Sequence, residues 1–335
     1  MVSRCFLGID IGGSSIKAGV VTDDGEVLAG QRIPSVLNDD LEAGLTRICS
    51  TALELIEQSG VAADAVQAIG LAAPGTMDLE QGVVFHPFNL PGWKNVPLAR
   101  LVSERLGLPV FLQNDANAAA YGEHWVGRAR GASSVMLWTL GTGLGAGIVI
   151  EGRIWTGAHS HAGECGHMIL QMDGGPPSEF GIDGSPELYV GARALVRRYS
   201  AAIEEQAGSP PPCRCEVTGA LTPLDIANAA AAGDRVAREC ILESARCLGV
   251  ATVSVMHVLN PEIILIGGAM TFGRDETELG RAFLERVRDE VRRRAFPIPA
   301  ERTVIDYAAL GGDAGFIGAA GYALSCLDAH CLDVS

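Results

Sequence analysis

The 335-residue sequence has no apolar run near the roughly 20 residues that a membrane-spanning helix needs. It also lacks a cluster of basic side chains, since 25 Lys and Arg face 40 Asp and Glu and the formal net charge is −15. Binding to a nucleic-acid backbone depends on clustered Lys and Arg, so this charge balance disfavours nucleic acid as a partner. The nearest candidate, Arg292-Arg293-Arg294, follows mixed charges at helical spacing and is typical of a solvated helix end.

The nine cysteines show no framework spacing, and no charged-then-apolar leader precedes them. Secreted, disulfide-stapled proteins typically carry both features. We therefore expect a soluble protein in a reducing compartment, the cytoplasm, with no membrane partner.

Two common nucleotide-binding patterns are missing or misplaced. No Gly-x4-Gly-Lys-Ser/Thr run exists, which excludes a P-loop enzyme. Residues 141–146, Gly-Thr-Gly-Leu-Gly-Ala, satisfy a loose dinucleotide fingerprint, but such a fingerprint must open a helix. Residues 147–150 (Gly-Ile-Val-Ile) instead predict a strand, and this context argues against a dinucleotide site.

Glycine is plentiful, with 42 residues, and 48% of the side chains are hydrophobic, a composition that suits packed α/β domains. The length allows two domains, each with its own core. Residues 5–11, 16–22 and about 26–33 predict three consecutive strands, and near-helical apolar spacing then continues to Gly60. The same strand, glycine turn and strand recur over residues 137–149, so we infer a duplicated βββ unit, one per domain.

The other expected elements follow from apolar runs, capping residues and alanine-rich stretches. Strands are predicted at residues 68–72, 110–113, 263–266 and 303–306, and helices at 115–125, within 225–259 and at 313–327, the last expected to pack back on the first domain.

Two glycine turns stand at matched positions in the repeat, at residues 12–13 and 141–143. Glycine lets the main chain approach a ligand closely, so a pair of such turns can present backbone N–H groups to a polyphosphate. Either turn alone is better explained by a tight β-turn. Their duplication favours a paired phosphate clamp for a nucleotide triphosphate.

The sequence resembles the ROK family of the hexokinase/actin/heat-shock-chaperone superfamily. The motifs that carry the resemblance span almost the whole chain: Leu7 to Lys17, Ala73-Pro74-Gly75-Thr76-Met77-Asp78, Asn89-Leu90-Pro91-Gly92-Trp93, Asn114-Asp115-Ala116-Asn117, Gly141-Thr142-Gly143-Leu144-Gly145, Gly163-Glu164-Cys165-Gly166-His167, and Asn260-Pro261-Glu262 through Gly267-Gly268.

The resemblance implies an α/β fold of two ribonuclease-H-like (actin-like ATPase) domains with a central cleft, binding ATP and magnesium on one side and a sugar on the other. We expect residues 1–118, with a helix at about 313–330, to form the N-terminal domain and residues 119–312 the C-terminal domain. A homodimer is expected from the resemblance alone. ROK repressors carry an additional N-terminal helix-turn-helix domain, for which we expect no room before the first strand.

The motifs look most like the glucokinase branch, which implies transfer of the γ-phosphate of ATP to the 6-hydroxyl of glucose. Kinases for N-acetylglucosamine, N-acetylmannosamine, mannose or fructose remain alternatives, because the residues that read the hydroxyls are shared. A second alternative is a non-catalytic sugar-sensing ROK protein. The intact Asp115 and both glycine turns argue against that alternative.

A sugar hydroxyl is a poor nucleophile, so a carboxylate should accept its proton during transfer. Asp115 stands at an expected strand-to-helix junction and matches the catalytic Asp of the family. Capping of the helix by Asn114 or Asp115 is the competing interpretation, and both can hold for adjacent residues.

The remaining site residues are assigned by their positions in the family motifs. Asp10 would hold Mg²⁺ through water, since metal and backbone donors must offset the developing charge. The nucleotide-binding candidates are Gly12, Gly13, Ser14, Lys17, Gly141, Thr142, Gly143, Gly267 and Gly268, and the sugar-binding candidates are Asn114, Glu164, His167, Glu187, Asn89 and Gly75.

ROK proteins commonly hold a structural zinc with three cysteines of a Cys-x-Cys-Gly-x2-Gly-Cys-x-Glu segment and the His of Glu-x-Gly-His. Here residues 178–187 read Ser-Glu-Phe-Gly-Ile-Asp-Gly-Ser-Pro-Glu, without any of the three thiolates. A tetrahedral zinc site has no basis without such ligands, so we predict no structural zinc. Phe180, Ile182 and nearby prolines are expected to order the loop by packing instead.

Overall fold

The computed structural model describes residues 4–13, 15–35, 40–87, 90, 92–179, 181–207 and 221–333. The chain divides into two compact units. The first unit consists of Met1–Leu137, Gly147–Gly163 and Ala308–Ser335, and the second of Trp138–Ala146 and Glu164–Tyr307.

The first sheet has five strands in the order β3-β2-β1-β4-β7. Strand β1 pairs antiparallel with β2 and parallel with β4, and β4 pairs parallel with β7. The strands are β1 (Cys5–Ile11), β2 (Ser15–Thr22), β3 (Val27–Pro34), β4 (Val66–Ala73) and β7 (Val110–Asn114), and a separate two-stranded sheet contains β5 (Thr76–Asp78) and β6 (Val83–His86).

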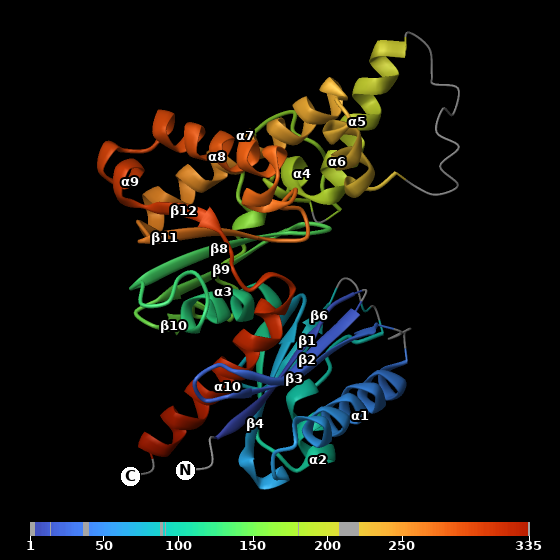
Figure 1. Ribbon diagram of the computed structural model, residues 1–335, viewed down its shortest axis with the longest axis vertical. Coiled ribbons are helices and arrows are strands. Elements are labelled where there is room, and N and C mark those ends of the chain that lie inside the picture. The colour runs from blue at the N-terminus through green and yellow to red at the C-terminus, as the bar shows by residue number, and fades with distance from the viewer. Residues whose placement is uncertain are drawn as a thin grey trace. The chain divides into compact units, whose positions relative to one another are not determined.

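Alternate side chains of β1 enter two cores, because successive strand residues point to opposite faces of a sheet. Leu7 and Ile9 belong to a core closed by α1 (Leu41–Ser59) and α2 (Leu98–Leu106). Phe6 faces the other side, where it packs with Phe316 of α10 (Ala314–Asp333). Figure 1 shows α10 in red along one face of the sheet and α1 on the other.

Helix α10 lies very close to the sheet because glycines face it. A Cβ added at Gly8 would stand 1.8 Å from the carbonyl oxygen of Phe316, and one at Gly70 would stand 1.9 Å from that of Ala319. The same helix packs on α3 (Asp115–Trp125), where a Cβ at Gly318 would stand 1.7 Å from the carbonyl oxygen of Ala118. Backbone-to-backbone packing thus fixes α10 against the first sheet and α3.

The second sheet has the order β10-β9-β8-β11-β12, which repeats the order of the first sheet. Its strands are β8 (Ser134–Leu140), β9 (Leu144–Ile150), β10 (Arg153–Ile154), β11 (Ile263–Gly268) and β12 (Val304–Tyr307). The predicted duplication of the βββ unit is therefore confirmed, and so is the expected α/β fold class.

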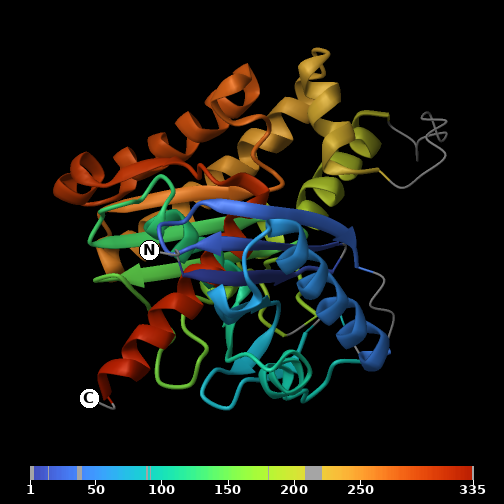
Figure 2. The same cartoon turned by 60° about the horizontal axis from the view of Figure 1, so that its bottom comes forward.

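The helices of the second unit are α4 (Glu187–Val190), α5 (Ala192–Ala207), α6 (Pro223–Ala231), α7 (Arg235–Leu259), α8 (Glu278–Arg294) and α9 (Pro297–Arg302). Helices α7 and α8 pack against each other, as both views show (Figures 1 and 2). Trp138 of β8 is fully buried, and its Nε1 donates a hydrogen bond to Oγ1 of Thr252 on α7 at 3.0 Å. Helix α7 is long and apolar enough to cross a membrane, but 61% of that segment is buried inside the protein, as in a core helix.

Most predicted elements are confirmed with boundaries that differ by at most three residues, while α10 continues to Asp333, past the expected end at residue 327. Gly60 caps α1 with a left-handed φ of 71°, and residues 225–259 hold two helices, as predicted. Beside β5 and β6, sequence reasoning missed the short 3-10 helices Ala63–Ala65, Cys165–His167, Arg274–Glu276 and Gly311–Asp313.

Candidate active site

The two carboxylates assigned to metal binding and catalysis lie at one edge of the first sheet. Asp10 on β1 is in register with Ala72 on β4, and Ala72 is in register with Gln113 on β7. Asp115 follows β7 by one residue. Neighbouring strands lie about 4.8 Å apart, so the ends of β1 and β7 are separated by about 10 Å. This carboxyl edge of parallel strands is where open α/β sheets bind their ligands.

The side chain of Asp10 is largely buried and lies beside a lysine. Its Oδ2 lies 3.4 Å from Nζ of Lys17, the residue opposite it on β2. Burial raises the pKa of the Asp10 carboxyl, and the charge of Lys17 opposes that rise without cancelling it. One carboxylate beside a lysine fits a Mg²⁺ ion held mainly by phosphate and water, which is how Mg²⁺ usually binds at nucleotide sites.

The first glycine turn connects β1 to β2. The N–H of Gly12 donates to the carbonyl oxygen of Ser15 at 3.0 Å, and Gly13 is exposed. A Cβ at Gly12 would stand 2.9 Å from that carbonyl oxygen, so the turn itself requires a small residue here. Ser14, the remaining candidate of this turn, lies outside the described residues.

Asp115 begins α3, and Asn114 is its N-cap. Oδ1 of Asn114 accepts hydrogen bonds from the N–H groups of Ala116 at 2.9 Å and Asn117 at 3.2 Å. The capping role considered for Asn114 is therefore observed. Asp115 is partly exposed, and its Oδ1 accepts from the N–H of Ala116 at 2.8 Å. Its carboxylate thus lies in the first turn of α3, where the helix dipole interacts favourably with negative charge.

Two buried amides that sequence reasoning missed support this helix start. Oε1 of Gln113 accepts from the backbone N–H of Asn114 at 2.9 Å and from Nδ2 of Asn117 at 3.3 Å. Oδ1 of Asn117 accepts from the N–H of Ile148 on β9 at 3.4 Å. Gln113 is fully buried, and this polar residue at the end of an apolar strand was the signal available in the sequence.

Gly75 lies beyond β4, at the same edge. Its φ of +90° and the carbonyl oxygen of His86, which a Cβ would meet at 2.4 Å, both require glycine. The backbone alone thus accounts for glycine at this position, and contact with a sugar stays a prediction. Asn89 lies outside the described residues.

The second unit carries the second glycine turn, between β8 and β9. The N–H of Gly141 donates to the carbonyl oxygen of Gly143 at 3.0 Å, and a Cβ at Gly141 would meet open space. Gly268, which follows Gly267 at the end of β11, has φ +92° and lies so close to Leu140 that a Cβ would stand 2.3 Å from its carbonyl oxygen. The two glycine segments assigned to the nucleotide are therefore neighbours.

Glu187 and the segment that carries Glu164 and His167 both lie against Leu144, at the start of β9. Oε2 of Glu187 accepts the N–H of Leu144 at 3.0 Å, and a Cβ at Gly143 would stand 2.0 Å from the same oxygen. A Cβ at Gly166, between Glu164 and His167, would stand 1.9 Å from the carbonyl oxygen of Leu144. The side chains of Glu164 and His167 lie 3.9 Å apart. Glu187 thus contacts the glycine turn directly. The sequence had suggested only a contact with the sugar.

The segment at residues 178–187 does not fit a zinc ion. Its polar groups bond to the chain itself: Oδ1 of Asp183 accepts the N–H of Ser178 at 2.7 Å, and Glu187 accepts from Leu144. Burial, with the nearby charge of Glu164, raises the pKa of the Cys165 thiol to about 11. Within the described ranges, no three His, Cys, Asp or Glu side chains gather as a metal site. Phe180, expected to help order this loop, lies outside those ranges.

The sequence and the fold are similar to known proteins over most of the chain. The sequence is 34% identical to a glucokinase of Halalkalibacterium halodurans over 318 residues, 95% of this chain and 94% of the relative. It is 31% identical to a xylose repressor of Caldicellulosiruptor bescii, over 87% of this chain and 71% of that protein. A Streptomyces griseus ROK glucokinase, solved in complex with glucose and AMPPNP, superimposes with a TM-score of 0.77 at 32% identity, covering 96% of this chain and 99% of that one.

The ROK family model matches residues 6–325, nearly the whole sequence. The motifs that suggested the resemblance all lie within this match. The chain belongs to the ROK family.

Proposed function

We propose that this protein is an ATP-dependent hexose kinase that phosphorylates glucose at the 6-hydroxyl. The supporting observation is the placement of Asp10 and Asp115 at one edge of three parallel strands. The glucokinase relatives, one of them solved with glucose and AMPPNP, support the choice of sugar and nucleotide. Phosphoryl transfer needs a positioned base and charge stabilisation, and these two carboxylates divide those tasks.

In this proposal, Asp115 accepts the proton of the attacking hydroxyl, while Gln113 and Asn114 bond the backbone N–H groups on either side of it. Asp10 would hold Mg²⁺ through water, and the bound ion would offset charge that develops on the phosphate oxygens. Lys17 adds a further positive charge beside Asp10. The N–H groups of Gly12 and Gly141 bond within the two glycine turns, so other backbone N–H groups of these turns would donate to the nucleotide phosphates.

Asn114, Glu164, His167 and Glu187 are assigned to the sugar hydroxyls, because a site built to hydrogen-bond a hydroxyl rejects a sugar that leaves its polar groups unpaired. The proposal also includes Mg²⁺ as the metal, a homodimer, a cytoplasmic location and domains at residues 1–118 with 313–330 and at 119–312.

Transfer of phosphate from ATP to a panel of sugars tests the proposal. We expect the highest kcat/KM with glucose, above N-acetylglucosamine, N-acetylmannosamine, mannose and fructose. A higher value with another sugar would change the substrate but keep the reaction. Glucose binding without transfer to any sugar would contradict the kinase and favour a sensor, the function that the xylose repressor relative keeps open.

A further inference from the structure

Glu187 accepts the N–H of Leu144 and is the first residue of a helix that is too short to be stable on its own. Helix α4 has only four residues, Glu187–Val190, and one isolated turn is not stable in water. Its carbonyl groups also have few partners within so short a helix. Contacts from outside α4 must therefore fix the position of Glu187.

Arg198 on α5 supplies such contacts. Its Nη2 donates to the carbonyl oxygen of Tyr189 on α4 at 2.7 Å, and its Nη1 donates to Oγ of Ser244 on α7 at 2.7 Å and to the carbonyl oxygen of Cys240 at 3.2 Å. One planar guanidinium therefore ties α4 to α7. A lysine cannot reproduce this fork, since its ammonium is a single point of donation.

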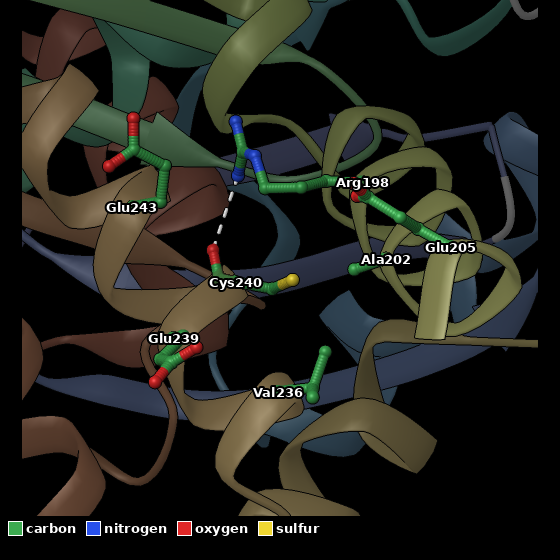
Figure 3. A pocket seen from close by; sticks show the side chains of 7 residues that line it. All are labelled: Arg198, Ala202, Glu205, Val236, Glu239, Cys240 and Glu243. Atoms are coloured by element: carbon green, nitrogen blue, oxygen red, sulfur yellow. Dashed lines mark hydrogen bonds between the residues drawn. The ribbon is translucent and has the colours of Figure 1, made fainter. Parts of the chain in front are cut away.

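Figure 3 shows the guanidinium of Arg198 beside the carbonyl group of Cys240. The groove there has a volume of about 570 Å³ and is also lined by Glu205, Glu239 and Glu243. Arg198 is the one cation among its lining residues. The acidic side chains alone do not indicate a ligand site. The hydrogen bonds of Arg198 to Ser244 and Tyr189 instead indicate that it holds neighbouring helices together.

The segment before α4 is closed by hydrogen bonds within the chain. Tyr189 Oη donates to Oε1 of Gln171 at 2.7 Å, and the N–H groups of Leu170 and Gln171 donate to the carbonyl oxygen of Gly184 at 2.9 and 3.1 Å. Asp183 closes the turn at Ser178. Tyr189 is thus bonded to the loop through its hydroxyl and to Arg198 through its carbonyl group.

We propose that Arg198 is a positioning residue for phosphoryl transfer. By holding the carbonyl group of Tyr189, it keeps Glu187 on the N–H of Leu144, and so fixes the Gly141–Thr142–Gly143 turn that binds phosphate. With the hydrogen bonds of residues 170–184, it orders this loop without a metal ion. The inference rests on the proposed function for its kinetic readout.

A double-mutant cycle tests this chain of contacts. We expect Arg198→Met to lower kcat/KM for ATP about tenfold, which corresponds to about 1.4 kcal/mol. Glu187→Ala should lower it at least as much. The double variant should be no worse than Glu187→Ala, because Arg198 acts only through Glu187. Arg198→Lys should recover part of the loss.

The matched control is Arg235→Met, which removes an exposed arginine of α7 that pairs with Glu239 at 3.6 Å. Hydrogen exchange of the peptide that contains Leu144 gives a readout without catalysis. It should quicken in Arg198→Met and Glu187→Ala and stay unchanged in Arg235→Met. Arg198→Met values equal to those of the control, or losses that multiply in the double variant, would overturn the proposal. A wild-type protein inactive on every sugar would instead contradict the proposed function, while the exchange comparison would still test Arg198.

Discussion

Gly315 lies directly against the carboxylate of Asp10: a Cβ added at Gly315 would stand 2.6 Å from Oδ2 of Asp10. Gly315 is the second residue of α10, so the first turn of this helix covers the side chain assigned to the metal. Sequence reasoning did not assign Gly315 to the site. Because glycine has no side chain, the Asp10 carboxylate can occupy the space beside Gly315.

Gly315→Ala should therefore reduce activity more than stability. The methyl group would meet the Asp10 side chain and shift it, while the substitution adds up to about 1 kcal/mol of helix propensity. We expect kcat/KM to fall about tenfold, with a small change in the melting temperature. Gly312→Ala is the matched control, since a Cβ there meets nothing within 4 Å. Equal activity of the two variants would contradict this account of Asp10.

Gly70→Ala should reduce stability instead, because the new methyl group meets the backbone of α10 at 1.9 Å rather than a movable side chain. Forced overpacking of this kind costs about 3 kcal/mol. Gly30→Ala, in β3 of the same sheet, is the control, since its nearest neighbour lies at 3.6 Å. Urea unfolding measures both variants, and equal midpoints would argue against close packing of α10.

Glu290 on α8 should make stability depend on acid pH. Its side chain is fully buried and lies within 2.8 Å of Arg286, Arg293 and Arg294. Burial alone would raise the pKa of Glu290, but hydrogen bonds from Arg294 and Arg293 and the charge of Arg286 outweigh it, so the pKa is lowered. A lowered folded pKa contributes stability above the unfolded value of about 4.3, which is lost as pH falls through the folded value.

Glu290→Gln should lower the free energy of unfolding by about 2 kcal/mol at pH 7 and flatten its pH dependence below pH 4.3. Glu285→Gln removes an exposed ion-pair partner on the same helix and should cost about 0.5 kcal/mol. Urea unfolding at several pH values measures both variants. An unchanged acid limb in Glu290→Gln would contradict the assignment.

A zinc chelator should leave the protein unaffected, because residues 178–187 lack the thiolates of a zinc site. Prolonged treatment with 1,10-phenanthroline should change neither the melting temperature nor the hydrogen exchange of the Glu187 loop. Metal analysis of the purified protein is the direct check. Stoichiometric zinc would show that other residues replace the missing cysteines.

The sequence predicted the features that depend on local pattern. Apolar runs and glycine turns gave the repeated βββ order, and a capping residue before an alanine-rich stretch gave the start of α3 at Asp115. Each of these signals lies within a few neighbouring residues, where propensity and periodicity act.

The contacts that fix the candidate site were not predictable in this way. Glu187 meets Leu144 across 43 positions, and Arg198 meets Ser244 across 46. Gly315 faces Asp10 from the opposite end of the chain. Such pairings arise from packing between elements, and a single sequence carries no periodicity that marks them.

Asp115→Asn tests the central claim most directly. Asparagine keeps the shape and the Oδ1 acceptor for the N–H of Ala116, and Asn114 still caps α3, so the fold should be retained. The account predicts that glucose and AMPPNP still bind while kcat falls by about a thousandfold or more, because the hydroxyl loses its proton acceptor. A kcat within about threefold of the wild-type value in a correctly folded variant would contradict the assignment of Asp115 as the general base.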